Sequence, residues 1–322
     1  MFTRKLGKSH IEVSAMGLGC WAIGGPWTWS DGRAMGWGQV DDAESIRAIR
    51  KALDLGINFF DTAANYGAGH SERILGQALA GRRDKVVIAT KFGHVINEET
   101  RVVYDDDDAL LQNIHQDCEN SLRRLDTDYI DVYQLHAGSY DPIKAVDVIE
   151  VLEELVSEGK IRTYGWSTDD PERARVFAQG EHCAAIQVRL HLLHLADDVL
   201  AVCDECDVGS INKSPLASGL LTGKFNADSK IADPQEWRSR VDFRAEGMTE
   251  FLKKLDTLRD VLTSDGRTLA QAALGWIWAH SERTVPIPGF KTVEQVEENV
   301  GAMEFGPLSE EQMTTIDDIL DR

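Results

Sequence analysis

Four side chains that can carry acid–base chemistry stand at comparable places in this sequence. Asp61 closes the apolar run INFF, and Tyr66 follows five residues later in the turn AANYGAG. Lys91 closes the run VVIAT, and His136 closes DYIDVYQL. Each residue alone has a structural explanation, such as a turn cap, a surface lysine or a satisfied core histidine. Their joint position after successive apolar runs indicates instead that they meet in one functional site.

The elements that must position these side chains alternate along the chain. Short apolar runs predict strands at residues 13–19, 57–61, 86–91, 129–136, 161–167, 184–188, 210–214 and 284–288. Longer amphipathic stretches predict helices at residues 42–55, 71–79, 109–125, 143–158, 171–179, 196–206 and 268–280, with further helices after the eighth strand. This alternation favours a single-domain (β/α)8 TIM barrel that covers residues 1–322.

An open, doubly wound sheet of eight strands is the alternative fold. Such a sheet would normally carry the glycine pattern G-x-G-x-x-G after its first strand, and this pattern is absent. In a barrel the carboxyl ends of all strands face one mouth, so residues far apart in sequence converge there. Two long segments, 21–40 and 215–246, follow the first and seventh strands, and we expect them to shape the mouth.

Composition excludes some classes of partner. The chain of 322 residues has 54 acidic and 34 basic residues, a formal net charge of −20, which argues against nucleic acid or an anionic membrane. No apolar segment is long enough for a signal peptide or a membrane span. Five scattered cysteines suit a reduced cytoplasm, and the isolated Cys203-x-x-Cys206 pair predicts neither a redox nor a metal role.

Several motifs together resemble the aldo-keto reductase family. They are DTAANYGAGHSE (61–72), the strand that ends at Lys91, QLH at His136, GKIRTYGWS (159–167) and SPLASGLLTGKF (214–225). The resemblance covers nearly the whole chain, and the first motif is specific. It implies a reversible NAD(P)H-dependent carbonyl reductase on a (β/α)8 barrel, without a metal.

The resemblance implies that Asp61, Tyr66, Lys91 and His136 form a catalytic tetrad. Hydride addition to a carbonyl builds charge on oxygen, and Tyr66 would supply the proton as general acid. A free phenol titrates near ~10, so a neighbouring Lys91 is expected to lower the pKa of Tyr66. Asp61 would hold Lys91, and His136 would donate a hydrogen bond to the substrate oxygen.

Cofactor residues follow from the same resemblance. Ser167 and Gln187 match residues that hold the nicotinamide carboxamide, whereas Thr168 replaces the usual Asn. The position of a stacking aromatic ring falls on Asn212 or Lys213, and we assign it to Lys213. The segment 214–224 resembles the loop that clasps the pyrophosphate, with candidate contacts from Ser214, Leu216, Ser218 and Lys224.

The segment 286–302 resembles the part of the family that binds adenosine and a 2′-phosphate, with candidate contacts from Gly289, Lys291, Gln295 and Asn299. Lys291 is the one obvious cation for a 2′-phosphate, and the arginine that many members have at Gln295 is absent. NADP(H) is therefore favoured as the cofactor, and NAD(H) is possible.

The substrate is a small carbonyl compound, and the sequence leaves its identity open. Trp21 is expected to line the site beside Tyr66 and His136, and its aromatic face suits a keto-sugar and an aromatic aldehyde equally. Residues 137–140 replace a Trp-Pro of many members, which predicts a more open wall. A redox-sensing regulatory subunit that binds the nucleotide with little turnover is the alternative function.

Overall fold

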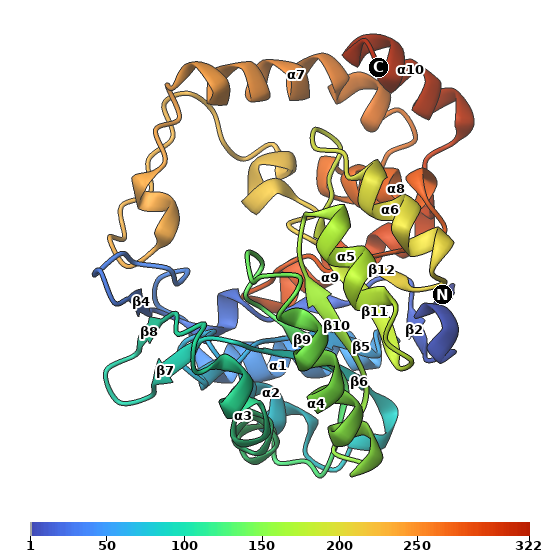
Figure 1. Ribbon diagram of the computed structural model, residues 1–322. Helices are drawn as coiled ribbons and strands as arrows, with labels where there is room; N and C mark the ends of the chain where they lie inside the picture. Colours follow the sequence, from blue (N-terminus) through green and yellow to red (C-terminus); the bar gives the residue numbers. More distant parts are fainter. Residues whose placement is uncertain (1) are drawn as a thin grey trace.

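Residues 2–322 are described by a computed structural model, and they form the predicted (β/α)8 barrel (Figure 1). Its parallel strands follow one another around the sheet in the order of the sequence. They are β3 (Leu18–Gly19), β5 (Phe59–Asp61), β6 (Val87–Phe92), β9 (Ile130–Leu135), β10 (Ile161–Ser167), β11 (Cys183–Arg189), β12 (Gly209–Lys213) and β13 (Thr284–Pro286).

The barrel closes between β3 and the segment that follows β13. Gly17 N donates to Pro286 O at 3.0 Å, and Gly19 N donates to Pro288 O at 3.0 Å. A Cβ atom at Gly19 would lie 2.9 Å from the carbonyl oxygen of Ile287. Only glycine allows the two backbones to approach this closely, so closure depends on this residue type.

Helices cover the outside of the barrel, and the predicted ones occur within two residues of their expected bounds. They are α1 (Asp42–Asp54), α2 (His70–Leu79), α3 (Leu110–Leu125), α4 (Ala145–Ser157), α5 (Pro171–Ala178), α6 (Asp197–Glu205) and α8 (Leu269–His280). Three more are α7 (Glu246–Leu262), α9 (Val293–Phe305) and α10 (Glu310–Leu320). No helix of residues 2–322 is long and apolar enough to cross a membrane.

The first predicted strand, residues 13–19, is wrong in its extent. The chain forms β2 (Glu12–Ser14), which pairs with β1 (Thr3–Lys5) in an antiparallel hairpin, and enters the barrel only at Leu18. Ser14 Oγ donates to Met16 O at 2.7 Å where the chain bends. Leu6 and Val13 are fully buried and belong to the same apolar cluster as barrel residues such as Phe59. The hairpin therefore contributes to the apolar interior of the barrel.

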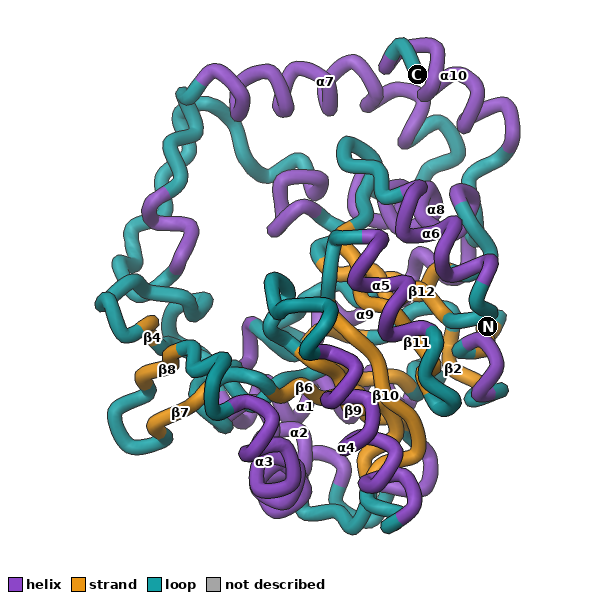
Figure 2. The backbone as a smooth tube through the Cα atoms, viewed as in Figure 1, coloured by secondary structure: helices purple, strands orange, loops and turns teal. Residues whose placement is uncertain are grey.

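Short elements in the loops were not predicted, because strands of two or three residues leave little periodic signal. They are β4 (Thr28–Trp29), β7 (Val95–Asn97) and β8 (Val102–Tyr104), which form a separate sheet, and the 3-10 turns η4 (Ala217–Thr222) and η5 (Trp237–Arg240). Figure 2 shows how much of this region is loop. The two long segments meet, since Trp237 N donates to Gly36 O at 2.9 Å and Trp37 forms a bridge with Glu236.

Cys203 and Cys206 lie at the end of α6, and both thiols are free. Cys203 is fully buried, and burial raises its pKa to about 12. Its thiolate, which is the reactive form, is therefore disfavoured at neutral pH.

The contact between α2 and α3 gives a test of the packing. A Cβ atom at Gly76 would lie 2.5 Å from Leu125 O, a backbone atom that cannot rotate away. Gly76→Ala should therefore destabilise the fold by about 1–3 kcal/mol, the usual range for overpacking. Gly247→Ala is the matched control, because that helical position has nothing within 4 Å. Equal thermal unfolding midpoints for the two variants would contradict this account.

Candidate active site

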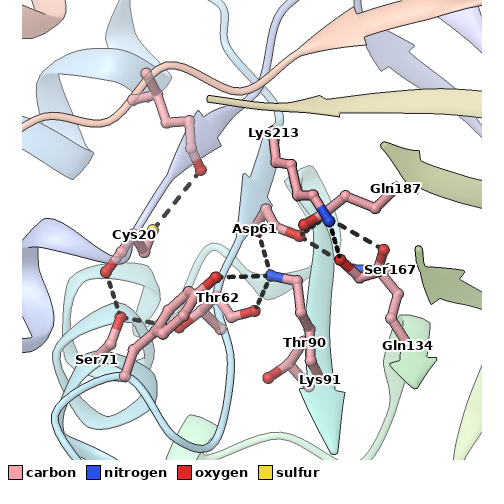
Figure 3. A network of polar contacts seen from close by, with 12 residues as sticks. Cys20, Asp61, Thr62, Ser71, Thr90, Lys91, Gln134, Ser167, Gln187 and Lys213 are labelled. Carbon is pink, nitrogen blue, oxygen red and sulfur yellow. Dashed lines mark hydrogen bonds and ion pairs between the residues drawn. The ribbon is translucent and has the colours of Figure 1, made fainter. Parts of the chain in front are cut away.

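The predicted residues Asp61 and Lys91 are in direct contact at the carboxyl ends of β5 and β6 (Figure 3). Tyr66, in the loop after β5, contacts the same lysine. Lys91 Nζ donates to Asp61 Oδ1 at 2.5 Å, to Thr62 O at 2.9 Å and to Tyr66 Oη at 3.3 Å. The lysine side chain is fully buried. All three donors of the ammonium group thus have an oxygen partner, as a buried charge requires.

The second carboxylate oxygen of Asp61 accepts two amide groups. Gln187 Nε2 donates to Asp61 Oδ2 at 2.7 Å, and Gln134 Nε2 donates to the same atom at 3.0 Å. Gln187 Nε2 also lies 3.2 Å from Gln134 Oε1. Sequence reasoning missed Gln134, although strand alternation puts it on the same face of β9 as His136, two residues later. The two amides hold Asp61 in the orientation that reaches Lys91.

The pKa values of Tyr66 and Lys91 are both raised, but for different physical reasons. Burial alone would lower the pKa of Lys91, but the charge of Asp61 and the contact with Tyr66 raise it above its usual value. Burial raises the pKa of Tyr66, and the opposing effect of Lys91 does not cancel this rise. The net change in the pKa of Tyr66 is therefore a rise, whereas a fall was expected from the sequence. The phenol keeps its proton at neutral pH.

His136 follows β9 and faces Tyr66, with the two ring centres 5.8 Å apart and nearly perpendicular. Its Nδ1 atom is buried and has no hydrogen-bond partner among the described residues. Burial, and then the nearby charges of His94, Lys91 and Lys213, hold the pKa of His136 well below its usual value. The ring is therefore a neutral imidazole, which can donate one hydrogen bond without acting as an acid.

A second layer of buried polar contacts supports the tetrad from below. Ser71 Oγ lies 2.8 Å from Thr62 Oγ1, next to the carbonyl that accepts from the active-site lysine. Thr90 Oγ1 donates to Glu72 Oε1 at 2.6 Å, and Arg124 Nε donates to Glu72 Oε2 at 2.5 Å. Glu72 is completely buried. The Ser-Glu pair that ends the first motif is thus explained by its contacts with the two strands that carry Asp61 and the lysine.

Ser167 and Lys213, two of the predicted nicotinamide contacts, lie together at the ends of β10 and β12 (Figure 3). Lys213 Nζ donates to Ser167 Oγ at 3.2 Å and lies 3.3 Å from Asp169 Oδ1. Thr168, which replaces the usual Asn, donates its hydroxyl to Gly138 O at 3.4 Å. Its side chain is thereby turned toward the loop after β9.

The predicted pyrophosphate loop has an unusual backbone. Ser214, Ser218 and Gly219 adopt left-handed conformations, with φ of 57°, 57° and 91°. Consecutive residues of this kind can form a concave nest of amide groups that suits an anion. Lys224 lies near this loop, because a Cβ atom at Gly219 would be 3.4 Å from its ammonium nitrogen.

A local group of cations accompanies this loop. Burial, followed by repulsion from Arg238, lowers the pKa of Lys224. Glu236, which pairs with Arg238, opposes this fall, and Lys291 adds to it. Arg238 donates to Ser218 O at 2.9 Å and lies 4.4 Å above the ring of Trp37. Sequence reasoning missed Arg238, whose only signal was its place in the charged segment 215–246. In a chain of net charge −20, such a group fits the phosphates of a dinucleotide.

The four residues predicted to bind adenosine gather at the start of α9. Lys291 N donates to Gln295 Oε1 at 2.7 Å, and Asn299 Nδ2 donates to Gly289 O at 3.4 Å. Lys291 Nζ donates to Trp37 O in the first long loop. The first long loop thus contacts the segment that precedes α9.

Aromatic rings form a wall beside the tetrad. Trp21 is roughly parallel to Tyr66, with ring centres 6.0 Å apart, and also to Trp237, at 6.2 Å. Trp37 stands edge-on to Trp21 at 5.3 Å. The indole nitrogens of these three tryptophans are buried without a hydrogen-bond partner within residues 2–322. Trp237 carries no signal in the sequence that marks it as a site residue, since it lies in the second long segment, far along the chain from Trp21 and Trp37.

A (β/α)8 barrel with Asp61, Tyr66, Lys91 and His136 close together at its mouth is typical of a class of barrel oxidoreductases, and comparison with known proteins agrees. Residues 15–321 match the model of the Aldo/keto reductase family. The chain therefore belongs to the aldo/keto reductase family, and it is an NAD(P)-dependent oxidoreductase that acts on carbonyl groups.

Relatives with known names or structures span nearly the full chain. It is 34% identical to the NADH-specific methylglyoxal reductase of Escherichia coli over 309 residues, 92% of each chain. The glycerol dehydrogenase of Gluconobacter oxydans has a similar structure, with a TM-score of 0.83 and 31% identity over 99% of this chain and 94% of that one. An aldo/keto reductase of Klebsiella pneumoniae in complex with NADP and acetate has a TM-score of 0.71 and 29% identity, covering 98% and 94%.

The Asp61–Lys91 pair should be essential to the stability of the barrel mouth. Asp61→Asn removes the counter-charge of a fully buried ammonium group, and breaking such a pair typically costs about 3–5 kcal/mol. We expect a clear fall in the thermal unfolding midpoint. The matched control is Asp108→Asn, an exposed carboxylate whose loss should change the midpoint little. Indistinguishable midpoints for the two variants would show that the pair is not a stabilising contact.

Proposed function

We propose that this enzyme reduces aldehydes or ketones to alcohols with Tyr66 as the general acid. The observation that carries the proposal is the unbroken chain of contacts from Tyr66 through Lys91 to Asp61. The bound reduced nucleotide supplies a hydride to the carbonyl carbon. The residues of the chain then have to neutralise the charge that develops on the carbonyl oxygen.

The proton comes from Tyr66. Because its pKa is raised, the phenol is protonated at neutral pH and can donate to the substrate oxygen. The phenolate that remains is stabilised by the Lys91 ammonium, 3.3 Å away. Asp61, held by its two glutamine partners, keeps that ammonium charged and in place. Neutral His136 donates a second hydrogen bond to the same substrate oxygen.

NADP(H) is the favoured cofactor in this proposal, and NAD(H) is possible. The proposal is supported by the cations Lys224, Arg238 and Lys291. It is also supported by the loop 214–219, in which several residues have positive φ. The relative from Escherichia coli is named as NADH-specific, whereas a Klebsiella pneumoniae relative was solved with NADP. The 2′-phosphate contact therefore has to be tested directly on this chain.

The substrates proposed here are small carbonyl compounds, keto-sugars included. The aromatic rings around Trp21 suit substrates that have a flat or weakly polar face. A panel should contain methylglyoxal and dihydroxyacetone, suggested by the names of the relatives, as well as aromatic aldehydes and keto-sugars. Oxidation of NADPH and of NADH is followed with each compound. Tight nucleotide binding with negligible turnover of every compound would favour the redox-sensing regulator instead.

Tyr66→Phe tests the proposed acid. The change removes one hydroxyl and keeps the ring that packs on Trp21, so fold and nucleotide affinity should survive. General acid catalysis typically contributes about 10²–10⁴-fold, and kcat for carbonyl reduction should fall by about that factor. Lys91→Met should lower kcat similarly, and the two losses should not add, since the residues act as one unit. Near-parental turnover by Tyr66→Phe, compared with the exposed control Tyr104→Phe, would refute the assignment.

Lys291→Met tests the preference for NADP(H). A charge-assisted contact to a phosphate is worth roughly 1.5–3 kcal/mol, so the Kd of NADPH should rise about tenfold or more. The Kd of NADH should stay nearly unchanged, because NADH lacks the 2′-phosphate. Lys230→Met, at an exposed loop position, is the control for a general loss of positive charge. An equal loss for both nucleotides would mean that Lys291 does not recognise the 2′-phosphate.

A further inference from the structure

Lys213 is a second lysine at the mouth of the barrel, and the proposed proton transfer does not use it. It is the last residue of β12, and its side chain is 28% exposed. Its ammonium group donates to Ser167 Oγ at 3.2 Å and faces the half-exposed Asp169 at 3.3 Å. Unlike Lys91, it touches neither Tyr66 nor a fully buried carboxylate. The positive charge of Lys213 is thus only partly neutralised by a nearby carboxylate.

The strand register places Lys213 beside the residues expected to hold the nicotinamide. Ser167 of β10 is paired with Gln187 of β11, and Arg189 of β11 is paired with Lys213 of β12. Figure 3 shows Ser167, Gln187 and Lys213 on one side of Asp61. A hydride donor must also come within about 3–3.5 Å of a carbonyl carbon whose oxygen sits at Tyr66. A nicotinamide ring that lies near Ser167 and Gln187, and that also reaches a carbonyl carbon at Tyr66, would have the Lys213 ammonium group beside it.

We infer that Lys213 makes this site distinguish the redox states of its nucleotide, so that the reduced form binds more tightly than the oxidised form. The oxidised nicotinamide ring carries a positive charge that the reduced ring lacks. A neighbouring ammonium group therefore repels the oxidised ring and leaves the neutral ring unaffected. An aromatic side chain at this position would stack on the ring without repelling either form electrostatically.

The charge state of Lys213 depends on its neighbours. Burial lowers its pKa, and repulsion by Arg189 and Lys91 acts in the same direction. Asp169 opposes both effects through its charge and its hydrogen bond. Asp169 thus limits the fall in the pKa of Lys213 and also screens part of its positive charge.

The consequence is that the enzyme releases the oxidised nucleotide more readily than the reduced one, which favours carbonyl reduction. Hydride transfer from the nucleotide to the carbonyl carbon, with the proton from Tyr66, leaves an oxidised ring beside Lys213. Repulsion should speed the release of that product and weaken product inhibition. The equilibrium constant of the overall reaction in solution is unchanged, because the effect lies in the affinities alone. This inference rests on the proposed function only for the position of the ring.

The test compares the Kd of NADPH with that of NADP⁺, measured by fluorescence titration without substrate. For the parent we expect NADP⁺ to bind about tenfold more weakly. Lys213→Met, which keeps chain length and removes the charge, should bring the two constants to within about twofold. Lys213→Arg, whose guanidinium group stays charged, should keep most of the difference. For a two-electron couple, a tenfold difference corresponds to about 30 mV in the potential of the bound nucleotide.

Other results would overturn the inference. An equal rise of both constants in Lys213→Met would mean that Lys213 only hydrogen-bonds the carboxamide, and no change in either would place it away from the ring. Should Lys213→Met fail to fold, Lys213→Gln also removes the charge and keeps a hydrogen-bonding group, and a tenfold difference retained by Lys213→Gln would overturn the inference. The ratio of the Kd of NADP⁺ to that of NADPH is measured without substrate, so it does not depend on turnover. A parent that reduces no carbonyl compound but shows the ratio would refute the proposed function alone.

Discussion

The buried ammonium group of Lys91 is the constraint on which the rest of this site depends. A charge with no exposed surface is tolerated only if every donor is satisfied and a counter-charge is close. Asp61 supplies the counter-charge, the carbonyl of Thr62 takes a second donor, and Tyr66 takes the third. The phenol of Tyr66 is thus held by the same contacts that make the buried lysine possible.

Asp61 in turn requires its own partners. Two glutamines from other strands, Gln134 and Gln187, donate to its second oxygen. Gln187 therefore has a structural task in addition to any contact with a nucleotide. A second buried polar group lies between the barrel and its helices, where Glu72 of α2 accepts from Thr90 of β6 and from Arg124 of α3. It joins these two helices to the strand that carries Lys91.

Charge is distributed unevenly in this acidic protein. The net charge of −20 would repel a dinucleotide, but Lys224 and Arg238 of the second long segment lie beside Ser218 and Gly219, and Lys291 contacts the first long segment at Trp37. Lys213 adds a fourth positive charge closer to the tetrad. Local cations in an acidic surface attract phosphates at the site while the remaining surface repels other polyanions.

The sequence by itself determined the barrel and the identity of its polar strand ends. Alternating apolar and amphipathic segments are local patterns, and the motif at Asp61 and Tyr66 is specific enough to indicate the family. Only the tertiary structure showed that Gln134, Arg238 and Trp237 belong beside these residues. It also decided the extent of the first strand and the net direction of the Tyr66 pKa shift. The physical reason is that burial, hydrogen-bond partners and charge–charge distances depend on which distant segments meet, and no local pattern encodes those encounters.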